Sequence, residues 1–154
     1  MKNNLFIFTP GFWIGEGMME LSDVSEKIPF IVKWMVPEAH PEDPFVELIQ
    51  QIQVKGHNEI LTNNFTLKEI LKQQFSIILE NDNIGQVMGS GQIKSDWIGW
   101  EFKENLIGFD GYEYYQHQGD GHYIMEAEYS TSDDLRTVMR GKLWKHTKAG
   151  IQGK

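Results

Sequence analysis

FTPGFWIGEG, residues 8–17, and LRTVMRGKLW, residues 135–144, lie near the two ends of the chain and together predict its fold. The second segment holds Arg136 and Arg140, the only arginines of the sequence. A guanidinium stacks on an indole ring better than an ammonium does, and a sheet that closes on itself pairs its first strand with its last. We therefore expect the two segments to meet in a barrel, with an arginine lying across Trp13.

The rest of the chain has the pattern of short strands separated by turns. Turn sequences recur at residues 81–85, 94–96, 118–121 and 131–134, and runs of β-branched and aromatic residues lie between them. This spacing predicts an all-β fold, an antiparallel up-and-down closed β-barrel of about 8–10 strands. Glycines within several runs favour a barrel over a sandwich, because they permit the bends that a small barrel needs.

Two segments leave alternatives open. Residues 66–73 begin like a helix-capping box followed by helix-forming residues, but they also continue an apolar strand pattern, so a short helix and a strand are both possible. The proline-rich stretch 37–44 is expected to be an exposed connector, with a lid over the barrel mouth as the alternative. We expect one barrel domain over residues 1–146 and a frayed tail over residues 147–154.

The composition excludes several classes of function. The net charge of −8 disfavours nucleic acid and anionic membranes as partners. The chain has no cysteine, so disulfides, thiolate zinc sites and cysteine nucleophiles are excluded. The apolar run at residues 5–8 is too short for the core of a signal peptide, and a cytoplasmic protein is therefore expected.

Gly11-Phe12-Trp13 matches the Gly-x-Trp signature that opens the first strand of lipocalins, and Arg136 or Arg140 suits the arginine of their last strand. The chain resembles the calycin group, which includes lipocalins, fatty-acid-binding proteins and bacterial lipocalin-like proteins related to nitrobindin. This resemblance implies a barrel whose interior binds a small, mostly apolar ligand. Nitrobindin-type haem proteins place an axial histidine just before the closing strand, and residues 132–140 contain none, so neither haem nor another cofactor is expected.

A four-residue loop at residues 118–121 would place His117 opposite His122, and a turn centred on residues 132–133 would place Tyr129 opposite Arg136. Because side chains alternate between the faces of a strand, this register predicts two faces. The acidic–histidine face consists of Glu113, His117, His122, Glu126 and Glu128. The tyrosine–arginine face consists of Tyr112, Tyr114, Tyr123, Met125, Ala127, Tyr129, Arg136, Val138, Arg140 and Trp144.

The tyrosine–arginine face is the better candidate for the barrel interior. Tyrosines and an arginine can hold a carboxylate by charge-assisted hydrogen bonds while apolar atoms fill the remaining space. The alternative is that the tyrosines only fill a core and the arginines cap tryptophans. The predicted ligand-binding residues are Arg136, Arg140, Tyr112, Tyr114, Tyr123, Met125 and Tyr129. The predicted closure residues are Gly11, Trp13 and Trp144.

The expected function is the binding of a small hydrophobic ligand, for which a fatty-acid-like anion is one candidate, by a monomer or homodimer. An isomerase, cyclase or hydrolase that uses Glu16, His117 or His122 as a base is the alternative, as is a barrel with a filled core. Glu16 is expected to point outward, since glutamate is usually exposed. A metal site on the acidic–histidine face is not expected, because solvent-facing strands commonly carry such residues.

Overall fold

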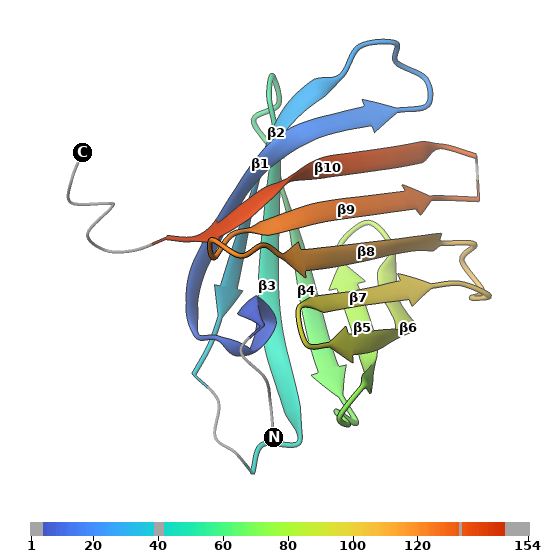
Figure 1. The fold of residues 1–154 in the computed structure, drawn as a ribbon. Coiled ribbons are helices and arrows are strands. Elements are labelled where there is room, and N and C mark those ends of the chain that lie inside the picture. The colour runs from blue at the N-terminus through green and yellow to red at the C-terminus, as the bar shows by residue number, and fades with distance from the viewer. Residues whose placement is uncertain (1–4, 39–41, 133, 147–154) are drawn as a thin grey trace.

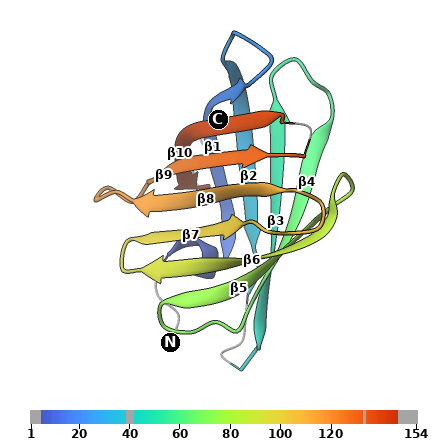
Figure 2. The same ribbon diagram turned by 90° about the vertical axis from the view of Figure 1, so that its right-hand side faces the viewer.

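A computed structural model describes residues 5–38, 42–132 and 134–146. Ten antiparallel strands each pair with the next along the chain, and the first pairs with the last, which confirms the predicted closed barrel (Figures 1 and 2). No helix of the described segments has the length and apolarity needed to cross a membrane. The strands are β1 (Gly11–Leu21), β2 (Ile28–Val36), β3 (Phe45–Val54), β4 (Ile60–Lys68), β5 (Gln74–Asn81), β6 (Gly85–Lys94), β7 (Trp97–Phe102), β8 (Asp110–His117), β9 (Tyr123–Ser130) and β10 (Arg136–Lys145).

The barrel closes where β1 meets β10, as the two end segments of the sequence predicted. Trp13 lies opposite Lys145, and Ile14 lies opposite Trp144. Further along the same seam Gly17 lies opposite Gly141, and a Cβ atom at either glycine would overlap the backbone of the other strand. Glycine at both positions therefore permits the close approach of β1 and β10.

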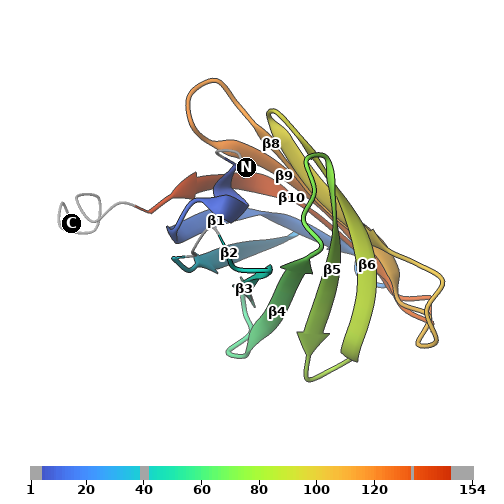
Figure 3. The same ribbon diagram turned by 90° about the horizontal axis from the view of Figure 1, so that it is seen from below.

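A short 3-10 helix, η1 (Phe6–Phe8), fills the end of the barrel where β1 begins and β2 ends (Figures 1 and 3). The Phe6 side chain has no exposed surface, and its backbone N–H donates to the Tyr123 hydroxyl over 2.9 Å. Its ring also contacts three further aromatic rings at centroid distances of 4.7 to 5.6 Å, those of Trp13, Trp34 and Tyr115. The apolar run at residues 5–8 is thus part of the core, a role that its length did not indicate.

Of the two alternatives for residues 66–73, the short helix is wrong, because the strand continues to Lys68. Residues 60–68 form β4, and Leu67 is fully buried between Val46 of β3 and Ile77 of β5. Apolar alternation along the strand outweighs the local helix propensity. The connector after Val36 begins at the η1 end, although its residues 39–41, like the tail at 147–154, lie outside the described part of the chain.

Aromatic side chains fill the half of the barrel next to η1. Trp34 stacks on Phe65 at a centroid distance of 5.4 Å and meets Trp100 edge-on at 5.9 Å. Tyr115 lies 5.9 Å from both tryptophan rings. These buried rings pack against one another and form an aromatic layer across this half of the barrel.

Candidate functional site

The register of the late strands differs by one residue from the prediction. The loop between β8 and β9 holds five residues, so His117 pairs with Tyr123 and Glu113 pairs with Ala127. His122 belongs to this loop, where its carbonyl accepts a 2.7 Å hydrogen bond from the backbone N–H of Gln118. A shift of one residue moves every side chain of a strand to the other face of the sheet.

The strands β9 and β10 are shifted by one residue as well. Arg136 pairs with Ser130, and Arg140 pairs with Glu126 rather than with Met125. The tyrosine–arginine face is therefore divided between the two sides of the barrel wall, and its placement as a whole inside the barrel is wrong. Tyr123, Met125, Ala127 and Tyr129 face the interior, whereas Tyr112, Tyr114, Arg136, Val138, Arg140 and Trp144 face outward.

The outward arginines and tyrosines make ion pairs and hydrogen bonds with glutamates on the surface. Arg140 lies 3.7 Å from Glu126 and 3.6 Å from Glu20, with 61% of its side chain exposed. The hydroxyls of Tyr112 and Tyr114 donate to the carboxylate of Glu126 over 3.2 and 3.0 Å. The carboxylate partner expected for these groups in a ligand is thus supplied by the protein itself. Arg136 makes a similar pair with Glu128 at 2.7 Å.

No arginine lies across Trp13, so that expectation is wrong. Arg140 sits opposite Met18, further along the seam, and the ring contacts of Trp13 are with Phe6 and Tyr123. The Trp13 indole N–H donates to the carbonyl of Thr9 over 3.2 Å. Gly11 and Trp144 lie near the same end of the β1–β10 seam, Gly11 opposite Val36 and Trp144 opposite Ile14.

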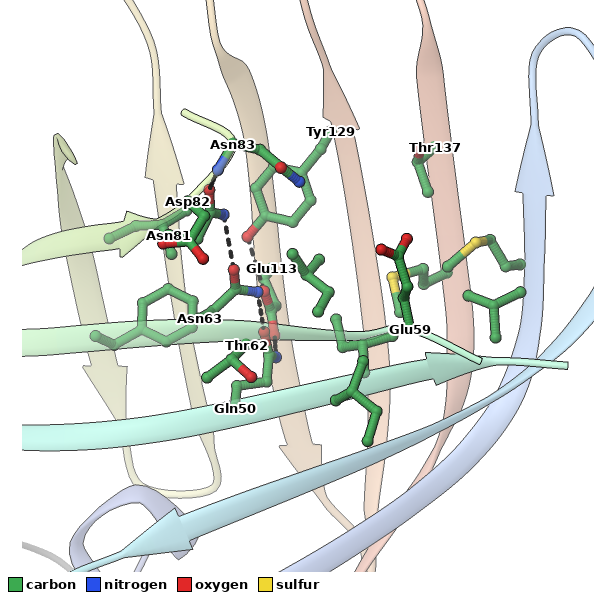
Figure 4. Close-up of a pocket in the computed structure, with 18 of the residues that line it drawn as sticks. Gln50, Glu59, Thr62, Asn63, Asn81, Asp82, Asn83, Glu113, Tyr129 and Thr137 are labelled. Carbon is green, nitrogen blue, oxygen red and sulfur yellow. Dashed lines mark hydrogen bonds between the residues drawn. The ribbon is translucent and has the colours of Figure 1, made fainter. Parts of the chain in front are cut away.

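A cavity of about 900 Å³ occupies the half of the barrel away from η1 (Figure 4). Its size is in the range of small-molecule sites. One side is apolar and comes mainly from β1, β2 and β10, with Met19, Ile28 and Met139 among its residues. The other side comes from β3, β4, β5, β8 and β9 and carries the polar residues Gln50, Asn63, Asn81, Glu113 and Tyr129 among apolar ones.

Glu113 is the central polar group of this cavity and is only 2% exposed. The Tyr129 hydroxyl donates to its Oε1 atom over 2.7 Å, and Gln50 Nε2 donates to its Oε2 atom over 2.7 Å. The Tyr115 hydroxyl also donates to Oε2. Burial raises the pKa of Glu113, and these three hydrogen bonds oppose the rise. Burial and the charge of Glu113 raise the pKa of Tyr115 and Tyr129 well above the usual value, so both hydroxyls remain donors.

Three amide side chains connect Glu113 to the rim of the cavity, and we call Gln50, Asn63 and Asn81 the amide ladder (Figure 4). Asn81 Nδ2 donates to Asn63 Oδ1 over 2.8 Å, and Asn63 Nδ2 donates to Gln50 Oε1 over 2.8 Å. At the rim, Asn81 Oδ1 accepts from the backbone N–H groups of Asn83 and Ile84, each over 2.9 Å.

The direction of the amide ladder follows from its anchor. Backbone N–H groups can only donate, so the oxygen of Asn81 must face the β5–β6 turn and its nitrogen must face Asn63. The same logic orients the next two amides, and the ladder ends with an N–H of Gln50 directed at Glu113. The protein thus presents only donors to this carboxyl group, which favours its ionised form.

The candidate bases of the enzyme alternative lie elsewhere. Glu16 is exposed on the outer face of β1, as expected. His117 packs edge-on against Tyr123 at 4.9 Å, at the η1 end, and His122 contacts the loop residue Asp120. Among the described residues no cluster of three or more His, Cys, Asp or Glu side chains is arranged to hold a metal ion.

Neither the interior position of Glu113 nor the amide ladder was predicted from the sequence. A signal was present, because Gln50, Asn63 and Asn81 each occupy the inward phase of an otherwise apolar alternation. In β3, for example, Val46, Leu48 and Ile52 share that phase with Gln50. A polar residue at an inward position in three successive strands indicates a buried polar cluster.

No protein-family model matches the chain, and no curated protein matches it by sequence. Solved structures do match in shape. Rv2717c from M. tuberculosis aligns with a TM-score of 0.67 and 13% identity over 92% of this chain and 94% of its own. The S-type phycobiliprotein lyase CPES from Guillardia theta aligns with a TM-score of 0.66 and 7% identity over 91% and 89%. At these identities the likeness concerns the fold alone.

Proposed function

We propose that the barrel binds a small, mostly apolar ligand in the cavity of about 900 Å³. The observation that carries this proposal is the hydrogen-bonded Glu113 cluster at the inner end of a cavity whose other wall is apolar. A few convergent polar groups in an apolar pocket are typical of sites that fix the orientation of a bound molecule. The likeness to other lipocalin-like barrels is consistent with binding but names no ligand.

Adjacent methionines of β1 provide a matched test. Met19 lines the cavity, whereas Met18 is 42% exposed on the outer face. We expect the neutral fluorescent probe N-phenyl-1-naphthylamine to bind to the wild type and to Met18→Trp, and its affinity to fall at least about tenfold in Met19→Trp, because the larger ring occupies the cavity. Absence of probe binding by the wild type, or equal affinity in the two variants, would refute the proposal.

An enzyme is the second candidate, and Glu113 is the observation that favours it. A buried carboxyl group with a raised pKa in a cavity is a common feature of acid–base sites. Native mass spectrometry separates the two functions. A bound molecule whose mass stays constant during incubation supports binding alone, whereas a change of its mass in the wild type but not in Glu113→Gln supports catalysis.

A further inference from the structure

We propose that the cavity selects an apolar molecule that carries an amine or another cationic nitrogen, whose N–H donates to Glu113. This inference rests on the proposed binding function and specifies the chemical class of the ligand. It replaces the fatty-acid-like anion suggested by the sequence, whose expected partners, Arg136 and Arg140, lie on the outer surface.

The first support is an acceptor position that the protein leaves open. A carboxylate has about four lone-pair positions, two on each oxygen. On Glu113, Oε2 accepts from both Tyr115 and Gln50, whereas Oε1 accepts only from Tyr129 among the described residues. Glu113 also lines the cavity. The second position on Oε1 is thus available to a donor on the ligand.

The second support is the charge of the cavity. The described residues that line the cavity include no lysine or arginine. His57, near the mouth, is the one histidine among them. The acidic residues Glu59, Glu80 and Asp82 line its outer part. A buried carboxylate without a positive partner is unfavourable, and a ligand cation would supply that partner. A ligand carboxylate would instead meet like charge.

The third support is the direction of the amide ladder. Because the β5–β6 turn fixes Asn81, each amide donates an N–H to the next, and the last of them, Gln50, donates to Glu113. The site is therefore arranged around an acceptor, and the complementary ligand group is a donor. The rings of Phe65, Phe109 and Tyr129 also line the cavity and can contribute cation–π contacts.

Three ligands of equal chain length test the charge preference directly. Decylamine, decan-1-ol and decanoate are compared as competitors of N-phenyl-1-naphthylamine at pH 7 on the wild-type protein. We expect decylamine to displace the probe at a concentration at least about tenfold lower than decan-1-ol, and decanoate to be the weakest. If the alcohol or the carboxylate competes as well as the amine, the inference is wrong while binding stands. If the probe itself does not bind, the proposed function fails.

Two variants test whether Glu113 causes the preference for the amine. Glu113→Gln keeps the size of the side chain but removes its charge, so we expect the advantage of decylamine over decan-1-ol to disappear. Glu101→Gln, on the exposed outer phase of β7, is the control and should keep the wild-type ranking. An amine preference that survives in a folded Glu113→Gln protein contradicts the assignment. If that variant does not fold, the wild-type ranking decides.

Discussion

Gln50 and Glu113 are joined by a 2.7 Å hydrogen bond, although their strands, β3 and β8, lie five places apart in either direction around the barrel. The bond therefore crosses the interior and links opposite walls. On one side of it lies the aromatic layer, which also holds the Tyr115 hydroxyl through a 3.1 Å hydrogen bond from the Trp34 indole. On the other side lies the cavity. This cross-link is thus the boundary between the filled and the open half.

Removal of this cross-link should destabilise the protein. Gln50→Ala leaves Glu113 without one donor and Asn63 without its acceptor, and buried groups that lose partners typically cost about 2–4 kcal/mol. We expect the free energy of unfolding in urea to fall by that amount. Gln53→Ala, at an exposed position of the same strand, should change it by less than about 0.5 kcal/mol. Similar effects of the two substitutions would contradict a structural role for the cross-link.

Glu113 should make stability depend on pH. Its pKa is higher in the folded protein than in the unfolded chain, so its favourable contribution is complete below the usual glutamate pKa and is lost as the pH rises through the raised value. The titratable groups that face it are Tyr115 and Tyr129, which stay protonated, and the carboxylates of the cavity mouth lie further out.

We therefore expect the stability of the wild type relative to Glu113→Gln to decrease from pH 4 to pH 8 in the absence of ligand. Urea unfolding of both proteins over this range measures the difference. Glu101→Gln provides the control for loss of a surface charge. A difference that stays constant or increases with pH would show that the folded protein does not raise the pKa of Glu113.

The 3-10 helix should be essential to the core. Phe6→Ala removes a ring that contacts four aromatic side chains, and truncation of a buried phenylalanine costs about 3–5 kcal/mol. Phe12→Ala, at a position that is 59% exposed, is the matched control and should cost under about 1 kcal/mol. Thermal and urea unfolding measure both. Equal losses would mean that η1 does not belong to the cooperative core.

Closure of the barrel should depend on the glycine pair of the seam. Gly17→Ala forces β1 away from β10, because its Cβ would overlap the backbone of Arg140. We expect a loss of more than about 2 kcal/mol, in the range of overpacking at a site that cannot relax. Gly119→Ala, where the added methyl meets no atom within 4 Å, should be tolerated. Equal stability of the two variants would mean that the seam adjusts without strain.

The arginines should be dispensable for binding. Arg136→Ala and Arg140→Ala remove only surface ion pairs, which typically contribute under about 1 kcal/mol. We expect the affinity for N-phenyl-1-naphthylamine to remain within about twofold of the wild type. A larger loss of affinity, in variants of unchanged stability, would mean that the arginines contact the ligand after all.

The fold could be predicted from the sequence because its signals are local. Glycine, asparagine or aspartate occurs in every connection between strands except residues 69–73, and the end segments with Trp13 and Arg140 contain the strands that close the barrel. Which side chains of β8, β9 and β10 face the interior was harder to predict, because it depends on the register of these strands. The loop after His117 accommodates His122 as a fifth residue, and this one residue decides whether Glu113 or Tyr114 faces the interior.

Two of the predicted ligand-binding residues, Met125 and Tyr129, line the cavity, but its central polar residues were not predicted. A tyrosine-lined interior is present, since Tyr115, Tyr123 and Tyr129 all face inward. Glu113 was assigned to the solvent face because the predicted register placed it on the side of the sheet opposite to the tyrosines and arginines. Two of its donors, Tyr115 and Tyr129, lie on the same strand and on the next one. The third, Gln50, comes from β3, and only the closed sheet brings it to Glu113.

The seam between β1 and β10 also governs when the protein can fold. The contact between Phe6 and Tyr123 spans 117 residues, and Trp13 meets Lys145 at the far end of the described chain. During synthesis β1 therefore leaves the ribosome long before β10, the second strand with which it pairs, has been made. The growing sheet carries open strand edges until β10 has emerged, and pairing of strands so far apart in the sequence generally slows folding.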